Sequence, residues 1–162
     1  MIDEALLEVK GLLATALGSA CKMYYAGNVG IPAKSALPCI VVRQKRTRVE
    51  RISTSKDQYR HTIGILVITN LISSLKTAGL SSSVRLADQT LRKLVEEADT
   101  DGAPKTTTVL GVLMQTANIR GSNYIYSLNP DVNYEIPAPD GHIMVAAEVT
   151  LDLVTELVVR KA

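Results

Sequence analysis

Four side chains could supply the soft ligands or nucleophiles that metal and acyl-transfer chemistry require: Cys21, Cys39, His61 and His142. Zinc sites draw pairs of ligands from short spacings, and these four residues show none. Neither histidine stands beside a serine or cysteine in a known catalytic pattern, and no Gly-x-Ser-x-Gly motif is present. We therefore predict no metal site, no cofactor and no catalytic residue, with two buried thiols in a reducing compartment. An enzyme would require one of the histidines to meet an acid in space.

Two other patterns also lack the context that their chemistry needs. Gly27 and Gly30 are not followed by Gly-Lys-Ser/Thr and do not join a strand to a helix, so they indicate turns and not a phosphate-binding loop. Glu96 and Glu97 are adjacent carboxylates, but neighbours on a helix point apart and do not form an acid–base pair.

A basic segment between residues 43 and 60 is the feature that most needs an explanation. It holds seven cations against two acids, a net charge of +5 in a chain whose total is +2. The cations are Arg43, Lys45, Arg46, Arg48, Arg51, Lys56 and Arg60. Arginine outnumbers lysine, which favours pairing with carboxylates or phosphates. The segment is either a solvated hairpin with protective edge charges or a surface that meets an acidic partner, protein or phosphate backbone.

An acidic cluster follows later in the chain. Its members are Glu96, Glu97, Asp99 and Asp101. They crowd the end of a predicted helix, where the helix dipole disfavours negative charge. A solvated helix end would account for them. A basic arm and an acidic patch in one chain also suggest a head-to-tail ring, in which the arm of one subunit meets a different surface of the next.

The composition predicts one soluble globular domain over residues 1–162. An apolar fraction of 46% and a charged fraction of 21% are typical of a folded domain, and the length suffices for one core. We find no apolar run long enough to span a bilayer and no secretory signal, because the chain opens with Met-Ile-Asp-Glu. The chain has no Trp or Phe and only six Tyr, which weakens any role in stacking single-stranded nucleic acid.

The elements of the first half are a helix, a short strand, a turn and a hairpin. Apolar residues at mostly three- and four-residue spacing, Ile2, Leu6, Val9, Leu13, Ala16 and Leu17, predict a first helix with Asp3 as its N-cap and Gly18 at its end. A short strand at Lys22–Tyr25 and a turn at 27–32 follow. We then expect one long β-hairpin whose roots, 39–42 and 63–68, are buried and whose arms, 43–62, stand away from the core around a turn at 53–57.

The second half is predicted to add one helix and more strands. The helix is capped at Ser81–Ser83 and stops at Gly102 and Pro104. Its apolar side comprises Val84, Ala87, Leu91, Leu94 and Val95. The further elements are a strand at Thr106–Thr116, a strand at Tyr124–Tyr126 that extends or pairs with it, a Pro-rich loop at 129–141 and a final strand at 143–157 with one buried and one wet face. This order favours an α+β fold: a mainly antiparallel sheet with a long projecting β-hairpin and two helices packed on one face.

The order of these elements resembles the tail terminator proteins of long-tailed phages over nearly the whole chain. The segments that carry the resemblance are the first helix, Ile31-Pro32, Leu37-Pro-Cys-Ile-Val-Val42, the polar hairpin, the strand Tyr59–Thr69, the helix Val84–Ala98 and the closing strand Ile143–Val158. The loop Asn129–Gly141 departs from the pattern and could be a joining surface specific to its own phage.

The resemblance implies a structural protein of the virion tail, assembled in the host cytoplasm. Such proteins form hexameric rings, bind the last ring of the tail tube protein, stop its growth and present the surface to which the head–tail connector docks, while DNA passes through the opening. The hairpin 43–62 would then face the tube, a neighbouring subunit or the lumen, and no membrane is involved. Two other classes remain open: a neck or head-completion protein, and a module that binds double-stranded nucleic acid.

Overall fold

The structure is a computed structural model that describes residues 2–30, 32–70, 80–115, 124–126, 130–136, 144–155 and 158–159. Its helices are α1 (Ile2–Leu17), α3 (Leu80–Glu96) and α4 (Val109–Gln115), with single 3-10 turns at Gly18–Ala20 and Lys34–Ala36. Its strands are β1 (Met23–Ala26), β2 (Cys39–Ser53), β3 (Lys56–Asn70), β4 (Tyr124–Tyr126), β5 (Asp131–Ile136), β6 (Met144–Thr155) and β7 (Val158–Val159).

The strands form one sheet in the order β1-β2-β3-β6-β4, with β5 also paired to β6 and β7 to β3. Every pairing is antiparallel except that of β1 with β2. The predicted α+β class with a mainly antiparallel sheet is therefore confirmed. None of the helices in the described ranges combines the length and hydropathy that crossing a bilayer demands.

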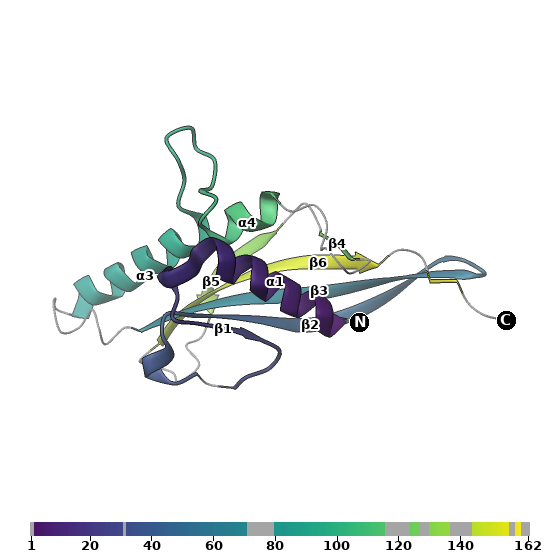
Figure 1. Ribbon diagram of the computed structural model, residues 1–162, viewed down its shortest axis with the longest axis horizontal. Coiled ribbons are helices and arrows are strands. Elements are labelled where there is room, and N and C mark those ends of the chain that lie inside the picture. The colour runs from purple at the N-terminus through teal and green to yellow at the C-terminus, as the bar shows by residue number, and fades with distance from the viewer. Residues whose placement is uncertain are drawn as a thin grey trace.

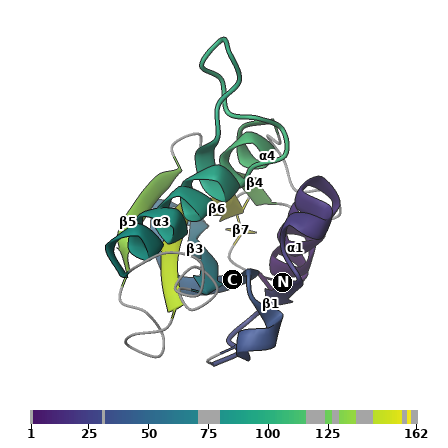
Figure 2. The same cartoon turned by 90° about the vertical axis from the view of Figure 1, so that its left-hand side faces the viewer.

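The main core lies between one face of the sheet and the helices. Figures 1 and 2 show α1, α3 and α4 together over this face. Aliphatic side chains from all three helices pack on inward-facing residues of β2, β3 and β6. The largest fully buried ones include Leu13, Ile40, Ile63, Ile65 and Leu153. Burial of this apolar surface drives the packing of the two layers.

The third of these helices, α4, corrects the prediction of a strand at Thr106–Thr116. The Thr108 hydroxyl accepts a hydrogen bond from the Gly111 N–H at 3.1 Å, and the Thr108 carbonyl accepts from the Val112 N–H at 3.0 Å. This is an N-cap, which satisfies amides that would otherwise lack partners. Val109, Val112 and Leu113 then face the core, so the cap and helix-period burial override the β propensity of the segment.

The N-termini of the two long helices, α1 and α3, differ from the prediction. Asp3 lies inside the first turn of α1, which begins at Ile2, and is not its N-cap. Ser81–Ser83 lie inside α3, whose described part begins at Leu80, so they do not cap it. Gly18 does adopt a left-handed φ of +53° where α1 ends, as expected. The predicted core side of α3 is buried at Ala87, Leu91, Leu94 and Val95, while the side chain of Val84 lies outside the described residues.

Two predictions on the second half of the chain change through pairing with β6. Tyr124–Tyr126 does form a strand, but it pairs with β6 and not with 106–116. Part of the Pro-rich segment predicted as a loop is strand β5, which also pairs with β6. Of the rest of that predicted loop, only Pro130 lies within the described residues.

The opposite face of the sheet carries a second, smaller apolar cluster, which lies at the N-terminal end of β6. It comprises Leu37, Cys39, Val41, Leu66, Ile68, Met144 and Ala146, with Tyr25 packed against it. The prediction that β6 has one wet face is therefore wrong for its first half. Glu148, placed on that wet face, is only 4% exposed.

Candidate interaction site

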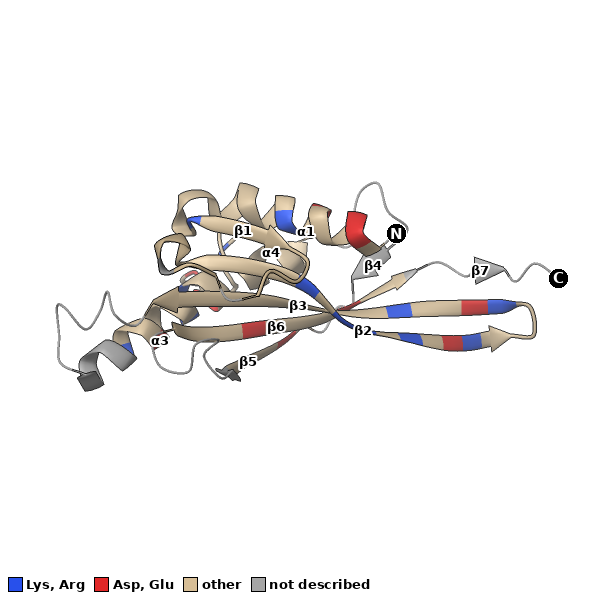
Figure 3. Ribbon diagram, turned by 90° about the horizontal axis from the view of Figure 1, so that it is seen from below, with Lys and Arg blue, Asp and Glu red and all other residues tan. Residues whose placement is uncertain are grey.

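The hairpin of β2 and β3 is the element on which the basic segment lies. Its strands pair from Cys39↔Ile68 to Ser53↔Lys56, so two residues form the turn. The roots are buried, but β2 is largely exposed from residue 44 onward. Figure 3 shows the outer half of the hairpin extending beyond the helices, with blue cationic segments along both strands. Near the tip, β7 pairs with β3 at Lys56 and Asp57.

The two faces of this outer half differ in chemistry. On the helix side, cross-strand pairing sets Val49 opposite Tyr59 and Thr47 opposite His61. The rings of Tyr59 and His61 stack with centroids 6.4 Å apart, and the Thr47 hydroxyl lies 2.8 Å from His61 Nδ1. Burial lowers the pKa of His61. The other face carries Arg46 opposite Thr62 and Arg48 opposite Arg60, so the cations gather there.

A buried carboxylate holds the base of the hairpin on this second face. Glu148 of β6 accepts hydrogen bonds from Arg43 Nη2 at 2.9 Å and from Lys45 Nζ. Burial alone would raise the pKa of Glu148, but the hydrogen bonds from Lys45 and Arg43 prevail and hold it below its ordinary value. The pairing register shifts between Gln44 and Arg46. This bulge places Lys45 beside Arg43 over one carboxylate, and bulges increase local strand twist.

Two more cations of the basic segment are paired within the chain. Arg60 contacts Glu50 at 3.5 Å and Asp152 at 3.3 Å, and Asp152 also accepts a hydrogen bond from the Thr62 hydroxyl at 2.7 Å. Arg51 lies 3.9 Å from Asp57. Together with Arg43 and Lys45, which share Glu148, four of the seven predicted cations have an acidic partner within the chain. The structure thus assigns Arg43, Lys45, Arg51 and Arg60 an internal role that the sequence analysis did not foresee.

The other three cations have no such partner within the ranges that the structure describes. Arg46 donates to the hydroxyl of Thr62, at 3.2 Å. Arg48 and Lys56, like Arg46, are exposed and have no carboxylate within 4.0 Å among the residues that the structure describes. We call Arg46, Arg48 and Lys56 the unpaired cations of the hairpin. They are the part of the predicted site that is available to another molecule.

The predicted acidic counter-surface lies on the last turn of α3 and on the loop 97–105 between α3 and α4. Glu96 contacts Arg92 at 3.5 Å, and Glu97 contacts Lys105 at 3.2 Å. Asp101 accepts a hydrogen bond from the Ala103 N–H at 3.0 Å. Asp99 and Asp101 are exposed, and neither has a cation within 4.0 Å in the described part of the chain.

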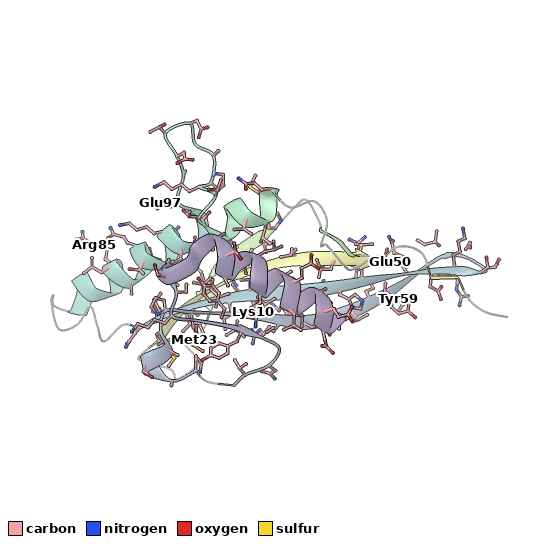
Figure 4. The ribbon with its side chains drawn as sticks, viewed as in Figure 1. Lys10, Met23, Glu50, Tyr59, Arg85 and Glu97 are labelled. Atoms are coloured by element: carbon pink, nitrogen blue, oxygen red, sulfur yellow. The ribbon has the colours of Figure 1, made fainter. Side chains whose placement is uncertain are left out.

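The basic and acidic surfaces do not meet within one subunit. Figure 1 shows the loop 97–105 rising from the helix layer, away from the tip of the hairpin. Figure 4 labels Glu97 at the foot of this loop and Glu50 on the hairpin, well apart along the molecule. Any contact between the two surfaces must therefore join different copies of the chain.

Glu148 and Asp152 are the residues of this site that sequence reasoning missed. Both belong to the polar alternation of the final strand, which predicts a solvated face. Glu148 could have been identified from the sequence, because it is the single acid within the apolar stretch 144–149. A charge in such a stretch is buried only with a partner. The partners of Glu148 lie more than 100 residues earlier in the sequence.

The cysteines and the described histidine do not form a metal site. Cys21 and Cys39 are buried free thiols, and burial raises the pKa of each to about 11. No group of three or more His, Cys, Asp or Glu side chains is arranged to hold a metal ion within the described ranges. His142 lies outside them.

Comparison with known proteins adds no further constraint. No protein-family model matches the chain, and no curated protein matches it.

Proposed function

We propose that this chain is a structural virion protein that forms a ring on the end of the phage tail tube, ends tube polymerisation and provides the surface to which the head docks. The proposal combines the resemblance to tail terminator proteins with the α+β fold, whose helices cover one face of a mainly antiparallel sheet. It assigns the hairpin an assembly role and assigns no catalytic role to any residue.

The observation that carries the proposal is the outer half of the hairpin. Arg46, Arg48 and Lys56 are exposed and unpaired there, and Val49 and Ile52 are 53% and 51% exposed. Strands that extend beyond their own core expose backbone groups and side chains that a second chain can cover. A protein partner accounts for both the apolar and the cationic residues of the arms.

The same observation weakens the alternative of a module that binds double-stranded nucleic acid. Affinity for duplex DNA grows with the number of phosphates that the protein neutralises. Four of the seven cations are already paired with carboxylates of the chain. Three unpaired cations supply little of the phosphate neutralisation that binding requires, so we favour a protein surface as the partner of the hairpin.

The test is mass measurement in solution followed by negative-stain microscopy with purified tail tubes. We expect closed rings and a ring at the ends of tubes, with tube growth halted when the protein is added during polymerisation. Rings that bind capsid portals and ignore tube ends would instead assign the chain to the neck. A protein that stays monomeric, alone and with tubes, would contradict both.

A pair of variants separates the role of the hairpin from general effects of charge. Arg46→Glu with Arg48→Glu should abolish capping. Lys22→Glu with Arg85→Glu changes the net charge equally at exposed positions away from the outer half of the hairpin and should cap tubes normally. Equal capping by both variants would contradict an assembly role for the hairpin.

A further inference from the structure

The hairpin has an open edge along most of β2. On the side away from β3, β1 pairs with β2 only from Cys39 to Val42. From residue 43 to residue 53, no strand in the described ranges pairs with that side. At about 3.3 Å per residue this edge is roughly 35 Å long. Its backbone N–H and C=O groups can therefore accept an extended segment of another chain.

The charges on this edge select the kind of segment that can dock. Arg46 and Arg48 are exposed, lie two residues apart and so share one face of the strand. Two β2 edges placed side by side would bring these like charges together, which is destabilising. The edge is thus unsuited to pairing with its own copy and suited to an acidic segment.

The loop 97–105 carries acidic residues and one strand-like position with outward-facing backbone groups. The Asp99 N–H donates to the Ala103 carbonyl at 2.8 Å, and the Lys105 N–H donates to the Glu97 carbonyl at 2.8 Å. Between these bonds, Ala98 and Pro104 face each other in an antiparallel bridge. The N–H and C=O of Ala98 therefore point to the outside of the loop, where a strand edge can reach them.

We propose that the loop 97–105 of one copy docks on the open edge of β2 of the next copy, with Asp99 and Asp101 against Arg46 and Arg48. The occupant is a second copy of this chain because the unpaired carboxylates of the loop complement the unpaired cations of the edge. The loop and the edge are different surfaces, so the contact repeats head to tail and can close a ring. The inference rests on the proposed function only in requiring self-assembly, since it names the contact from which the ring would be built.

A charge swap tests the contact. Arg46→Glu with Arg48→Glu, and separately Asp99→Lys with Asp101→Lys, should each raise the concentration for half-assembly about tenfold or more, which corresponds to about 1.4 kcal/mol. The variant that combines all four substitutions should assemble like the wild type, as measured by sedimentation velocity. Lys22→Glu with Arg85→Glu is the matched control and should leave assembly unchanged. Assembly unaffected by the acidic-loop variant, or no recovery in the combined variant, would overturn the contact.

Cysteine cross-linking gives an independent geometric readout. Arg48→Cys and Asp99→Cys introduce exposed thiols, whereas the native thiols are buried with raised pKa values. After oxidation, a mixture of the two variants should form disulfide-linked dimers, and either variant alone should form far fewer. Equal cross-linking in all three samples, or none in the mixture, would overturn the proposed register.

The two proposals fail separately. If Asp99→Lys with Asp101→Lys assembles normally and still caps tubes, the loop–edge contact is overturned and the tail-capping proposal stands. Rings that are rescued by the charge swap but ignore tube ends would support the contact and overturn tail capping.

Discussion

Gly64 lies directly beneath the carboxylate of Glu148: a methyl group on Gly64 would come within 2.8 Å of Glu148 Oε2 and 3.0 Å of Lys45 Cδ. The absence of a side chain at this point of β3 leaves room for an ion pair to cross the strand. Arg43, Lys45 and Glu148 can therefore join β2 to β6 across β3 at the base of the hairpin.

Substitution of this glycine should destabilise the protein. Gly64→Ala crowds the ion pair, and overpacking of a filled site costs about 1–3 kcal/mol. The measurement is the free energy of unfolding from urea denaturation. Gly11→Ala is the control, because Gly11 lies in α1 with nothing within 4 Å of an added methyl group. It should stabilise the protein by up to about 1 kcal/mol, so effects of the same sign in both variants would contradict the packing seen at Gly64.

Stability should fall in acid through Glu148. The pKa of this carboxyl is lowered in the folded protein, so the unfolded chain takes up the proton first. The contribution of Glu148 is complete above the ordinary pKa of a glutamate carboxyl, about 4.3, and is lost as pH falls toward the lower folded pKa. Glu148→Gln should reduce this acid dependence of the unfolding free energy.

The same variant should cost about 1–3 kcal/mol at neutral pH, because Arg43 and Lys45 lose a charged acceptor. Asp88→Asn breaks the exposed pair of Asp88 with Arg92, 2.9 Å apart, and should cost much less because water screens an exposed ion pair. Equal losses in both variants, measured by urea denaturation, would contradict the role given to the buried carboxylate.

The cap of α4 should be measurable. Thr108→Ala removes the hydroxyl that accepts from the Gly111 N–H, and loss of an N-cap costs about 0.5–2 kcal/mol. Thr108→Ser keeps the acceptor and should retain most of the stability. A Ser variant as unstable as the Ala variant would show that the cap does not stabilise the helix.

Both thiols should be inert in the folded protein. Burial raises the pKa of Cys21 and Cys39 to about 11, so little thiolate exists at pH 8. Ellman's reagent should leave both unreacted over minutes in buffer and modify both at once in denaturant. Rapid modification of either thiol in buffer would contradict the packing around β1 and β2.

Binding of duplex DNA through the hairpin should be weak and only mildly dependent on salt. The three unpaired cations of the hairpin contribute a slope of log K against log salt concentration of about −2.7. Fluorescence anisotropy with a random duplex across a salt series measures this slope. A much steeper slope would show that the paired cations also reach phosphates, and it would restore the nucleic-acid alternative.

The sequence by itself determined the elements in which apolar residues repeat at a regular helical or strand spacing. The first helix, the buried roots of the hairpin and the final strand each repeat apolar residues at a spacing that fits only one kind of backbone, so they could be predicted nearly to their ends. Turn chemistry was also local: Gly18 adopts the left-handed φ that its position predicts. The position and net charge of the basic segment needed no structure at all.

Only the tertiary structure decided that residues 109–115 form a helix and which charged side chains pair with one another. Residues 109–115 are helical because burial against α1 and α3 outweighs a weak β propensity, and the local Thr108 cap adds to the stability of the helix. Glu148 is buried because β3 brings it beside Arg43, which is 105 residues away in sequence. A charge pattern along a chain gives the number of cations, but the contacts that neutralise four of them form only when distant strands meet, since Coulomb attraction depends on separation in space and on exclusion of water.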